Sequence, residues 1–291
     1  MFRLAVAFGL MIAALGVARA ADAPRRIVSF NLCADLLVLA LADPEQIAGL
    51  STFAADPDLS VMAGKARPFP KLDQRSEATV ALQPDLVLVG PTDRSSIRTV
   101  LTRLGLHVEE VGLVKDVASA RVQVRALAAR LGHPERGEAL IAAIDAAQKR
   151  LHAVAGADTR TALVVERGGY TAGPDSLVVN LLREAGFMLP QGAPSGLGGF
   201  VPLERLLLIH PDVLAMHDSG ESAADQGAAF LTHPALDALY PLSERLIMPR
   251  RLSLCGGPAI VAALDYLTGV LHPPALRTFT RASLRSATTT R

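Results

Sequence analysis

Apolar residues recur at helical spacing between Pro134 and about Val154. Their intervals are four, three, four and three residues, which places them on one face of a helix: Leu140, Ile144, Ala147, Leu151 and Val154. Pro134 suits the first helical turn, because its missing N–H would lack a helical partner there in any case. Gly156 is a stop signal. The pattern therefore predicts one long helix, within a linking segment over residues 132–156.

A second pattern occurs once on each side of this helix. Each copy has a glutamate seven residues before a Pro-Asp pair and a short apolar run after it: Glu77 with Pro84-Asp85, and Glu204 with Pro211-Asp212. Each copy predicts a short helix, a turn and a buried strand. A Pro-Asp pair often joins a helix to a strand by itself. The matching spacing about one helix nevertheless favours an internal duplication, and hence two similar α/β lobes.

Strands and helices alternate through both halves of the chain. Strands are predicted at residues 26–30, 47–50, 86–89, 107–111, 161–165, 213–216 and 246–248, with helices or loops between them. This order is typical of parallel sheets with helices on both faces. We expect an N-terminal lobe over residues 25–131 and a C-terminal lobe over residues 157–273. Ligands of such sheets bind beyond the carboxyl ends of the strands, so the loops after the strands should face a cleft between the lobes.

The two ends of the chain have a different composition. Residues 1–20 contain Arg3, an apolar stretch from Leu4 to Val17 and the small-x-small site Ala18-Arg19-Ala20, which is typical of a cleaved signal peptide. An uncleaved membrane anchor is the alternative. Residues 274–291 contain arginines, serines and threonines but no acidic residue, and we expect them to be disordered.

Charge and composition narrow the function. Cleavage after residue 20 removes two of the 29 basic residues and none of the 28 acidic ones, so the mature chain carries a net charge of −1. Nucleic acid is therefore not an expected partner. The sequence contains no G-x-S-x-G and no phosphate-binding G-x-x-x-x-G-K motif. Its two cysteines, Cys33 and Cys255, suggest a disulfide in an exported protein.

These features together resemble the class III periplasmic substrate-binding proteins, which serve ABC importers for ferric siderophores, haem and cobalamin. The stretch from Arg26 to Asp35 (RIVSFNLCAD) and the stretch Cys255-Gly-Gly-Pro258 are similar to the first and last cleft loops of the family. The resemblance covers about residues 25–273. It implies two α/β lobes that move little about a stiff helix. It also implies a monomeric periplasmic receptor, without enzymatic activity or resident cofactor, that delivers an iron or cobalt chelate to an inner-membrane permease.

The resemblance also implies site residues. In the family, one glutamate on each lobe docks onto arginines of the permease, and Glu77 and Glu204 match those positions by motif. The alternative is that both are first-turn acids favoured by the helix dipole. Ten residues fall in or near the cleft loops and are candidate ligand contacts: Asn31, Leu32, Cys33, Phe53, Arg67, Thr92, Tyr170, Ser219, Arg251 and Cys255.

Several of these candidates have competing roles. Tyr170 is either a phenolate ligand of ferric iron, as in haem-binding members of the family, or a plain contact. Arg67, Arg167 and Arg251 either pair with carboxylate or catecholate groups or are solvated loop charges. The histidines are scattered, so bare-metal binding is not expected. With no Trp and few aromatic residues, cobalamin is a less favoured ligand than the iron chelates.

The two cysteines also leave alternatives. Cys33 and Cys255 form a disulfide that joins the lobes, line the pocket as thiols, or are inert buried residues. A different class of function would be a periplasmic redox or hydrolytic enzyme that uses Cys33.

Overall fold

The computed structural model describes residues 23–72, 76–91, 93, 95–156, 160–217 and 226–271. The expected signal peptide and C-terminal tail lie outside these residues, as do two candidate ligand contacts, Thr92 and Ser219.

The N-terminal half contains a four-stranded parallel sheet. Its strands are β1 (Ile27–Ser29), β2 (Ile47–Gly49), β3 (Leu86–Val89) and β4 (Val108–Glu110), in the order β2-β1-β3-β4. The helices of this half are α1 (Leu32–Leu41), α2 (Ala63–Ala66), α3 (Ser76–Ala81), α4 (Ser95–Arg103) and α5 (Val117–Leu131). All four strands connect through crossovers, as the alternating pattern predicted.

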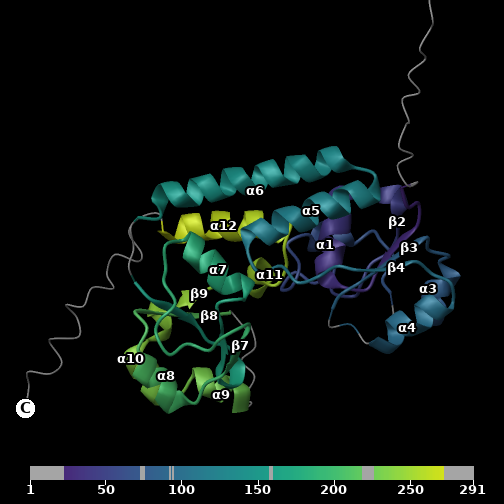
Figure 1. The fold of residues 1–291 in the computed structure, drawn as a ribbon. Helices are drawn as coiled ribbons and strands as arrows, with labels where there is room; N and C mark the ends of the chain where they lie inside the picture. The colour runs from purple at the N-terminus through teal and green to yellow at the C-terminus, as the bar shows by residue number, and fades with distance from the viewer. Residues whose placement is uncertain are drawn as a thin grey trace, which may run out of the picture.

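The C-terminal half repeats this sheet. Its strands β5 (Ala162–Val164), β8 (Val213–Met216) and β9 (Leu246–Ile247) are parallel and lie in the order β5-β8-β9. An isolated parallel bridge joins Thr161, just before β5, to Met188. Met188 thus takes the place beside β5 that β2 takes beside β1. Both halves therefore share one strand order, and the predicted fold class of two α/β lobes on one helix is confirmed (Figure 1).

The Pro-Asp repeat has the same structural role in both lobes. The Asp85 carboxylate accepts hydrogen bonds from the backbone N–H groups of Arg25 (2.7 Å) and Arg26 (3.0 Å), just before β1. The Asp212 carboxylate accepts from the N–H (2.8 Å) and the hydroxyl (2.9 Å) of Thr161, just before β5. Each aspartate therefore ties the start of one strand to the start of its neighbour, which is why the pair recurs immediately before an apolar run.

The sequence did not predict every element of the C-terminal half. Its helices are α7 (Leu177–Glu184), α8 (Leu203–Ile209), α9 (Gln226–Leu231), α10 (Pro234–Leu239), α11 (Arg250–Ser253) and α12 (Pro258–Leu271). No strand is predicted within residues 166–173 or 192–200, where the glycine-rich sequence indicates loops, but β6 (Tyr170–Ala172) and β7 (Gly198–Phe200) form an antiparallel ribbon there. Glycine has a low propensity for strands, so β7, which contains two glycines, cannot be recognised from strand propensity. A Cβ on Gly198 would lie 2.3 Å from the Thr171 oxygen, so the close pairing requires glycine.

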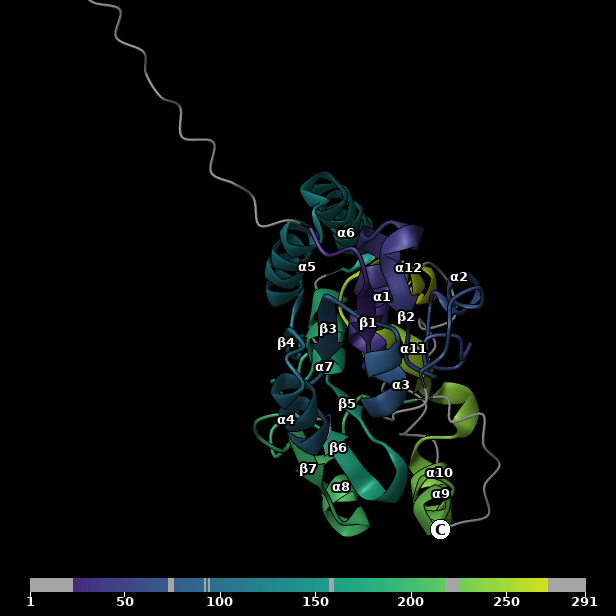
Figure 2. The same ribbon diagram turned by 90° about the vertical axis from the view of Figure 1, so that its right-hand side faces the viewer.

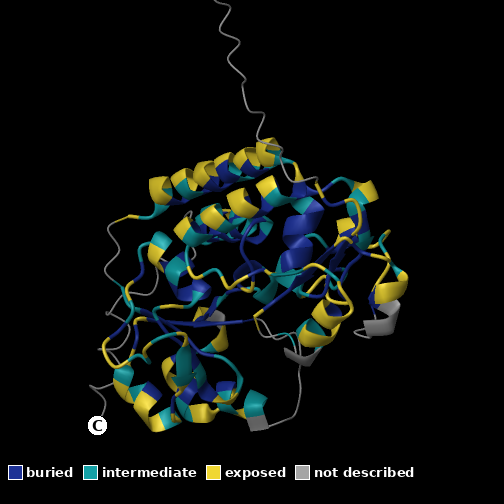
Figure 3. Ribbon diagram, turned by 45° about the vertical axis from the view of Figure 1, so that its right-hand side comes forward, coloured by how far each residue is buried: buried dark blue, intermediate teal, exposed yellow. Residues whose placement is uncertain are grey.

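The long helix α6 (Pro134–Val154) packs against both α5 and α12 (Figure 1). Its Ile141 belongs to the apolar core of the N-terminal lobe. Its Ile144, Ala147 and Leu151 belong to the core of the C-terminal lobe. Figure 2 shows α1 and α12 under this helix, and Figure 3 shows its outer face exposed and its inner face buried. One continuous apolar face therefore serves two cores, so bending α6 would disturb both.

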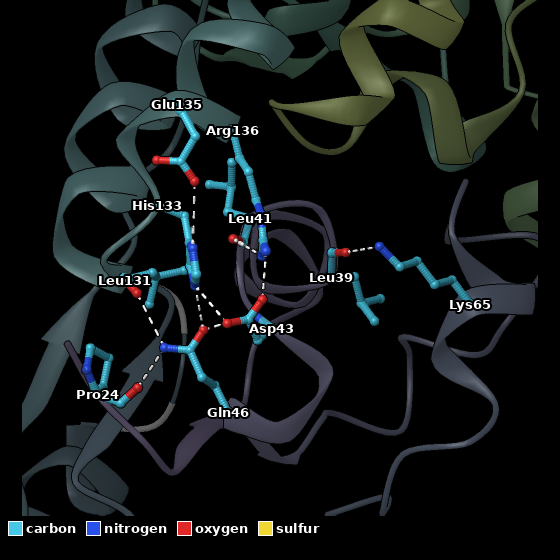
Figure 4. Close-up of polar contacts among 10 residues, drawn as sticks. All are labelled: Pro24, Leu39, Leu41, Asp43, Gln46, Lys65, Leu131, His133, Glu135 and Arg136. Carbon is cyan, nitrogen blue, oxygen red and sulfur yellow. Dashed lines mark hydrogen bonds and ion pairs between the residues drawn. The ribbon is translucent and has the colours of Figure 1, made fainter.

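Polar contacts fix the start of α6 (Figure 4). The Gln46 amide donates to the carbonyls of Pro24 (2.6 Å) and Leu131 (3.2 Å), and its oxygen lies 2.8 Å from Nε2 of His133. Arg136 pairs with the Asp43 carboxylate at 2.5 Å. The segment before β1, the loop after α1 and the junction of α5 with α6 are thereby held together.

Candidate functional site

A disulfide joins the first turn of α1 to the segment between α11 and α12. Cys33 and Cys255 are bonded with an S–S distance of 2.09 Å across 222 residues of sequence. Cys255 is only 2 % exposed and packs with Leu36 and Ala259. Leu32, a candidate ligand contact, packs partly buried against the same cluster. In this structure neither cysteine is a free thiol, and the residues beside them fill the junction between the lobes.

An open groove of about 710 Å³ lies between the two lobes. One wall comes from the loop after β2, and the other from α11 and α12; its lining residues include Asp58, Ser60, Val61, Arg251 and Tyr266. The structure thus places Arg251, a candidate from the sequence, on an interlobe surface. Arg67 is exposed just after α2, in the same loop but outside the lining of this groove.

Phe53 is held in the loop after β2 by a buried carboxylate. Asp35, in the first turn of α1, has no exposed surface and accepts hydrogen bonds from the N–H (3.2 Å) and the hydroxyl of Ser51. The Ser51 hydroxyl in turn accepts from the N–H of Phe53 (3.3 Å), whose side chain is 43 % exposed. Burial raises the pKa of Asp35 to about 6, although hydrogen bonds from Ser29 and Ser51 oppose the change.

Asn31 and Gly90 meet at the carboxyl ends of β1 and β3. The Asn31 side chain accepts the Cys33 N–H at 2.9 Å and caps α1. A Cβ on Gly90 would lie 2.2 Å from the Asn31 amide nitrogen. Only glycine therefore fits at that strand end, and the two residues close this edge of the N-terminal sheet.

The corresponding edge of the C-terminal lobe is polar and partly open. Glu166 follows β5, His217 follows β8 and Ser253 ends α11, the helix after β9. Nε2 of His217 lies 2.8 Å from the Ser253 hydroxyl, and its Nδ1 lies 3.5 Å from the Glu166 carboxylate. Contact with His217 and the charge of Arg250 hold the pKa of Glu166 below its usual value, although burial acts in the opposite direction.

The sequence pattern does not single out this cluster. His217 is one of several histidines scattered along the chain. The position of these residues in the sequence could have identified them. Glu166 and His217 each follow a predicted strand directly, at the edge where α/β sheets bind ligands.

The antiparallel ribbon presents two aromatic rings. Tyr170 and Phe200 pack edge to face with ring centroids 5.6 Å apart, and the Tyr170 hydroxyl donates to the Leu197 carbonyl at 3.3 Å. Phe200 is 77 % exposed. The ring pair is therefore an accessible apolar surface beside the Glu166 loop.

The two glutamates of the repeat lie in corresponding helices. Glu204 is exposed in the first turn of α8. Glu77 lies in the first turn of α3, and its side chain is outside the described part of the structure.

Two further properties concern the described residues only. No helix among them combines the length and the apolar character needed to cross a bilayer. Among the same residues, His, Cys, Asp and Glu side chains do not gather in threes in a way that would hold a metal ion.

The fold and the interlobe groove define a two-lobed α/β binding protein. The family model described as "Periplasmic binding protein" matches residues 27–240, and the chain belongs to this family. No curated protein matches the chain.

Solved structures share the fold across nearly the whole chain. A periplasmic haem-binding protein from Pseudomonas aeruginosa is 21% identical with a TM-score of 0.68, over 86% of this chain and 93% of that one. An Fe3+-hydroxamate transport protein from Saccharomonospora viridis is 20% identical with a TM-score of 0.68, over 86% and 94%. A periplasmic vitamin B12-binding protein from Vibrio cholerae is 14% identical with a TM-score of 0.65, over 85% and 96%. At these identities the likeness establishes the class III fold.

Proposed function

We propose that this protein is the periplasmic solute-binding component of an ABC importer, which captures a metal chelate and delivers it to the permease. The observation that carries the proposal is the pair of lobes with one strand order on a shared helix, with a groove between them. The family match and the similar structures support it, since their named ligands are haem, an Fe3+-hydroxamate and vitamin B12.

The alternative of an enzyme that uses Cys33 is weaker. A catalytic cysteine acts as a thiolate, and the sulfur of Cys33 is bonded to Cys255.

The exposed side chains of the two lobes suit a ligand with both apolar and polar surface. Outside the residues that line the groove, the exposed ring of Phe53 lies on the N-terminal lobe and the ring pair Tyr170 and Phe200 lies on the C-terminal lobe. Arg251 supplies a positive charge between the lobes. A chelate with a flat or rounded apolar face and a polar rim makes use of both kinds of contact.

Titration of the mature protein tests this function. Haemin, ferric siderophores and cobalamin are added separately, and binding is followed by absorbance or calorimetry. We expect saturable, stoichiometric binding of one of these chelate classes without turnover. Failure of all of them to bind would contradict the proposal.

Glu77 and Glu204 are proposed as the contacts with the permease. They occupy matching helices of the two lobes, which suits a partner with approximate two-fold symmetry. Charge reversal of both residues is expected to abolish uptake in cells while ligand affinity of the purified protein stays unchanged. Charge reversal of Glu138, an exposed residue on α6, is the matched control. Normal uptake by the double variant would remove this assignment.

A further inference from the structure

The polar cluster at the carboxyl edge of the C-terminal sheet has hydrogen-bonding capacity that the protein does not use. His217 is only 7 % exposed, yet its Nδ1 makes no hydrogen bond within the described chain. Nε of Arg250 is likewise buried without a hydrogen-bond partner there. Buried polar atoms are normally paired. Nδ1 of His217 still faces the Glu166 carboxylate at 3.5 Å, so Nε of Arg250 is the atom here that points to a missing partner.

The orientation of the His217 ring is fixed by Ser253. The Ser253 hydroxyl holds Nε2 of His217 at 2.8 Å, which turns Nδ1 towards Glu166. The 3.5 Å from Nδ1 to the carboxylate is the length of an ion pair and is long for a hydrogen bond. Glu166 makes no ion pair with Arg250 among the described residues, although the charge of Arg250 acts on it. The carboxylate and the guanidinium therefore both remain able to bind a further group.

The charge of Glu166 decides which group fits. A ligand carboxylate would place a second negative charge beside this partly buried one, which costs free energy. A carboxamide carries an N–H donor for Glu166 and a carbonyl acceptor for Arg250 in the same planar unit. It therefore pairs with the Glu166 carboxylate and with Nε of Arg250 without adding charge.

We propose that Glu166, His217 and Arg250 form a subsite for a neutral carboxamide group on the rim of the bound chelate. The carboxamide donates to the Glu166 carboxylate and accepts from Nε of Arg250, while His217 stabilises the ionised Glu166. The subsite lies beside the ring pair Tyr170 and Phe200, because the Glu166 N–H donates to the Tyr170 carbonyl at 2.7 Å. This inference rests on the proposed function and narrows it to chelates with amide groups on the rim, such as corrinoids or amide-linked hydroxamates.

The test compares three probes on the mature full-length chain. Dicyanocobinamide carries a rim of carboxamides, ferrioxamine B carries amides between its hydroxamates, and haemin carries two carboxylates. We expect one of the two amide-bearing probes to bind at least about tenfold more tightly than haemin, since a hydrogen bond to a charged group is worth about that factor or more. Tighter binding of haemin than of both amide-bearing probes would overturn the subsite.

Variants then assign the effect to these residues. Glu166→Gln keeps the shape but removes the charge, and is expected to weaken the amide-bearing probe about tenfold while haemin binding stays equal or improves. Arg250→Gln is the second variant, expected to weaken the same probe, and Glu138→Gln on α6 is the matched control. Unchanged affinity in both Glu166→Gln and Arg250→Gln would refute the inference. If none of the three probes binds the unmodified protein, the proposed function itself fails, and the subsite with it.

Discussion

The two lobes share a scaffold but differ at the edge that faces the ligand. Both sheets have one strand order, and Asp85 and Asp212 tie matching strand starts together. At the carboxyl ends, however, the N-terminal lobe has Asn31 packed against Gly90, with no room for a Cβ. The C-terminal lobe has Glu166 and His217 at the corresponding strand ends.

This difference separates what the two lobes have in common from what distinguishes them. Contacts at the amino ends of the strands set the register of each sheet, so they are alike in both lobes. The carboxyl ends do not carry the register. In the N-terminal lobe this edge is filled by Asn31 against Gly90, whose N–H donates to the Asp93 carboxylate, whereas in the C-terminal lobe it carries Glu166 and His217. A ligand held between the lobes therefore meets an asymmetric pair of walls, and each lobe is expected to make a different contribution to binding.

The largest expected effect concerns the covalent link between the lobes. The double variant Cys33→Ser, Cys255→Ser releases a loop of 222 residues. The unfolding free energy should fall by about 3–5 kcal/mol, because the unfolded chain regains the entropy that the link removes. Urea denaturation measures this loss, and the unmodified protein under reducing conditions should match the variant. A loss below about 1 kcal/mol would show that the lobes are held together without the disulfide.

The next effect concerns the buried acid of the N-terminal lobe. The pKa of Asp35 is raised to about 6 in the folded protein, so its contribution to stability is fully present below the unfolded pKa near 4 and is lost as pH rises through 6. The difference between the folded and unfolded pKa of Asp35 corresponds to about 3 kcal/mol of unfolding free energy. In Asp35→Asn, the unfolding free energy should fall less between pH 4 and pH 7 than in the unmodified protein. If denaturation showed that the unfolding free energies of the two proteins change in parallel with pH, this prediction would be wrong.

A smaller effect tests the equivalence of the two scaffolds. Asp85→Ala and Asp212→Ala each remove two hydrogen bonds at a strand start. Each should lower the unfolding free energy by about 1–2 kcal/mol, with the exposed Asp58→Ala as a control that changes little. A large cost in one lobe alone would mean that the repeat has kept its structural role on one side only.

The smallest expected effect on stability belongs to Phe200. Its ring is 77 % exposed, so Phe200→Ala should change the unfolding free energy by less than about 0.5 kcal/mol. Ligand affinity should nevertheless fall several-fold, since the ring pair with Tyr170 is lost. Calorimetric titration beside a thermal melt separates the two quantities. Equal affinity of Phe200→Ala and the unmodified protein would remove the ring pair from the binding surface.

The sequence by itself determined the elements and their symmetry. The bounds predicted for β3 and β8 are those of the structure, and the long helix runs from Pro134 to Val154 as its apolar spacing predicted. These features depend on periodicity, caps and turn residues, which act within a few positions along the chain. The repeated pattern of a glutamate followed by a Pro-Asp pair is also local. The similarity of the two lobes could therefore be predicted before any contact was known.

The tertiary structure decided which residues meet at the ligand-facing edge. The ribbon of β6 and β7 depends on glycines that permit close approach between segments about 28 residues apart. The cluster of Glu166, His217 and Ser253 draws on the ends of β5, β8 and α11, and the link from Cys33 to Cys255 spans nearly the whole chain. No local pattern encodes such proximity, because it arises only when packed sheets and helices bring distant loops to one edge.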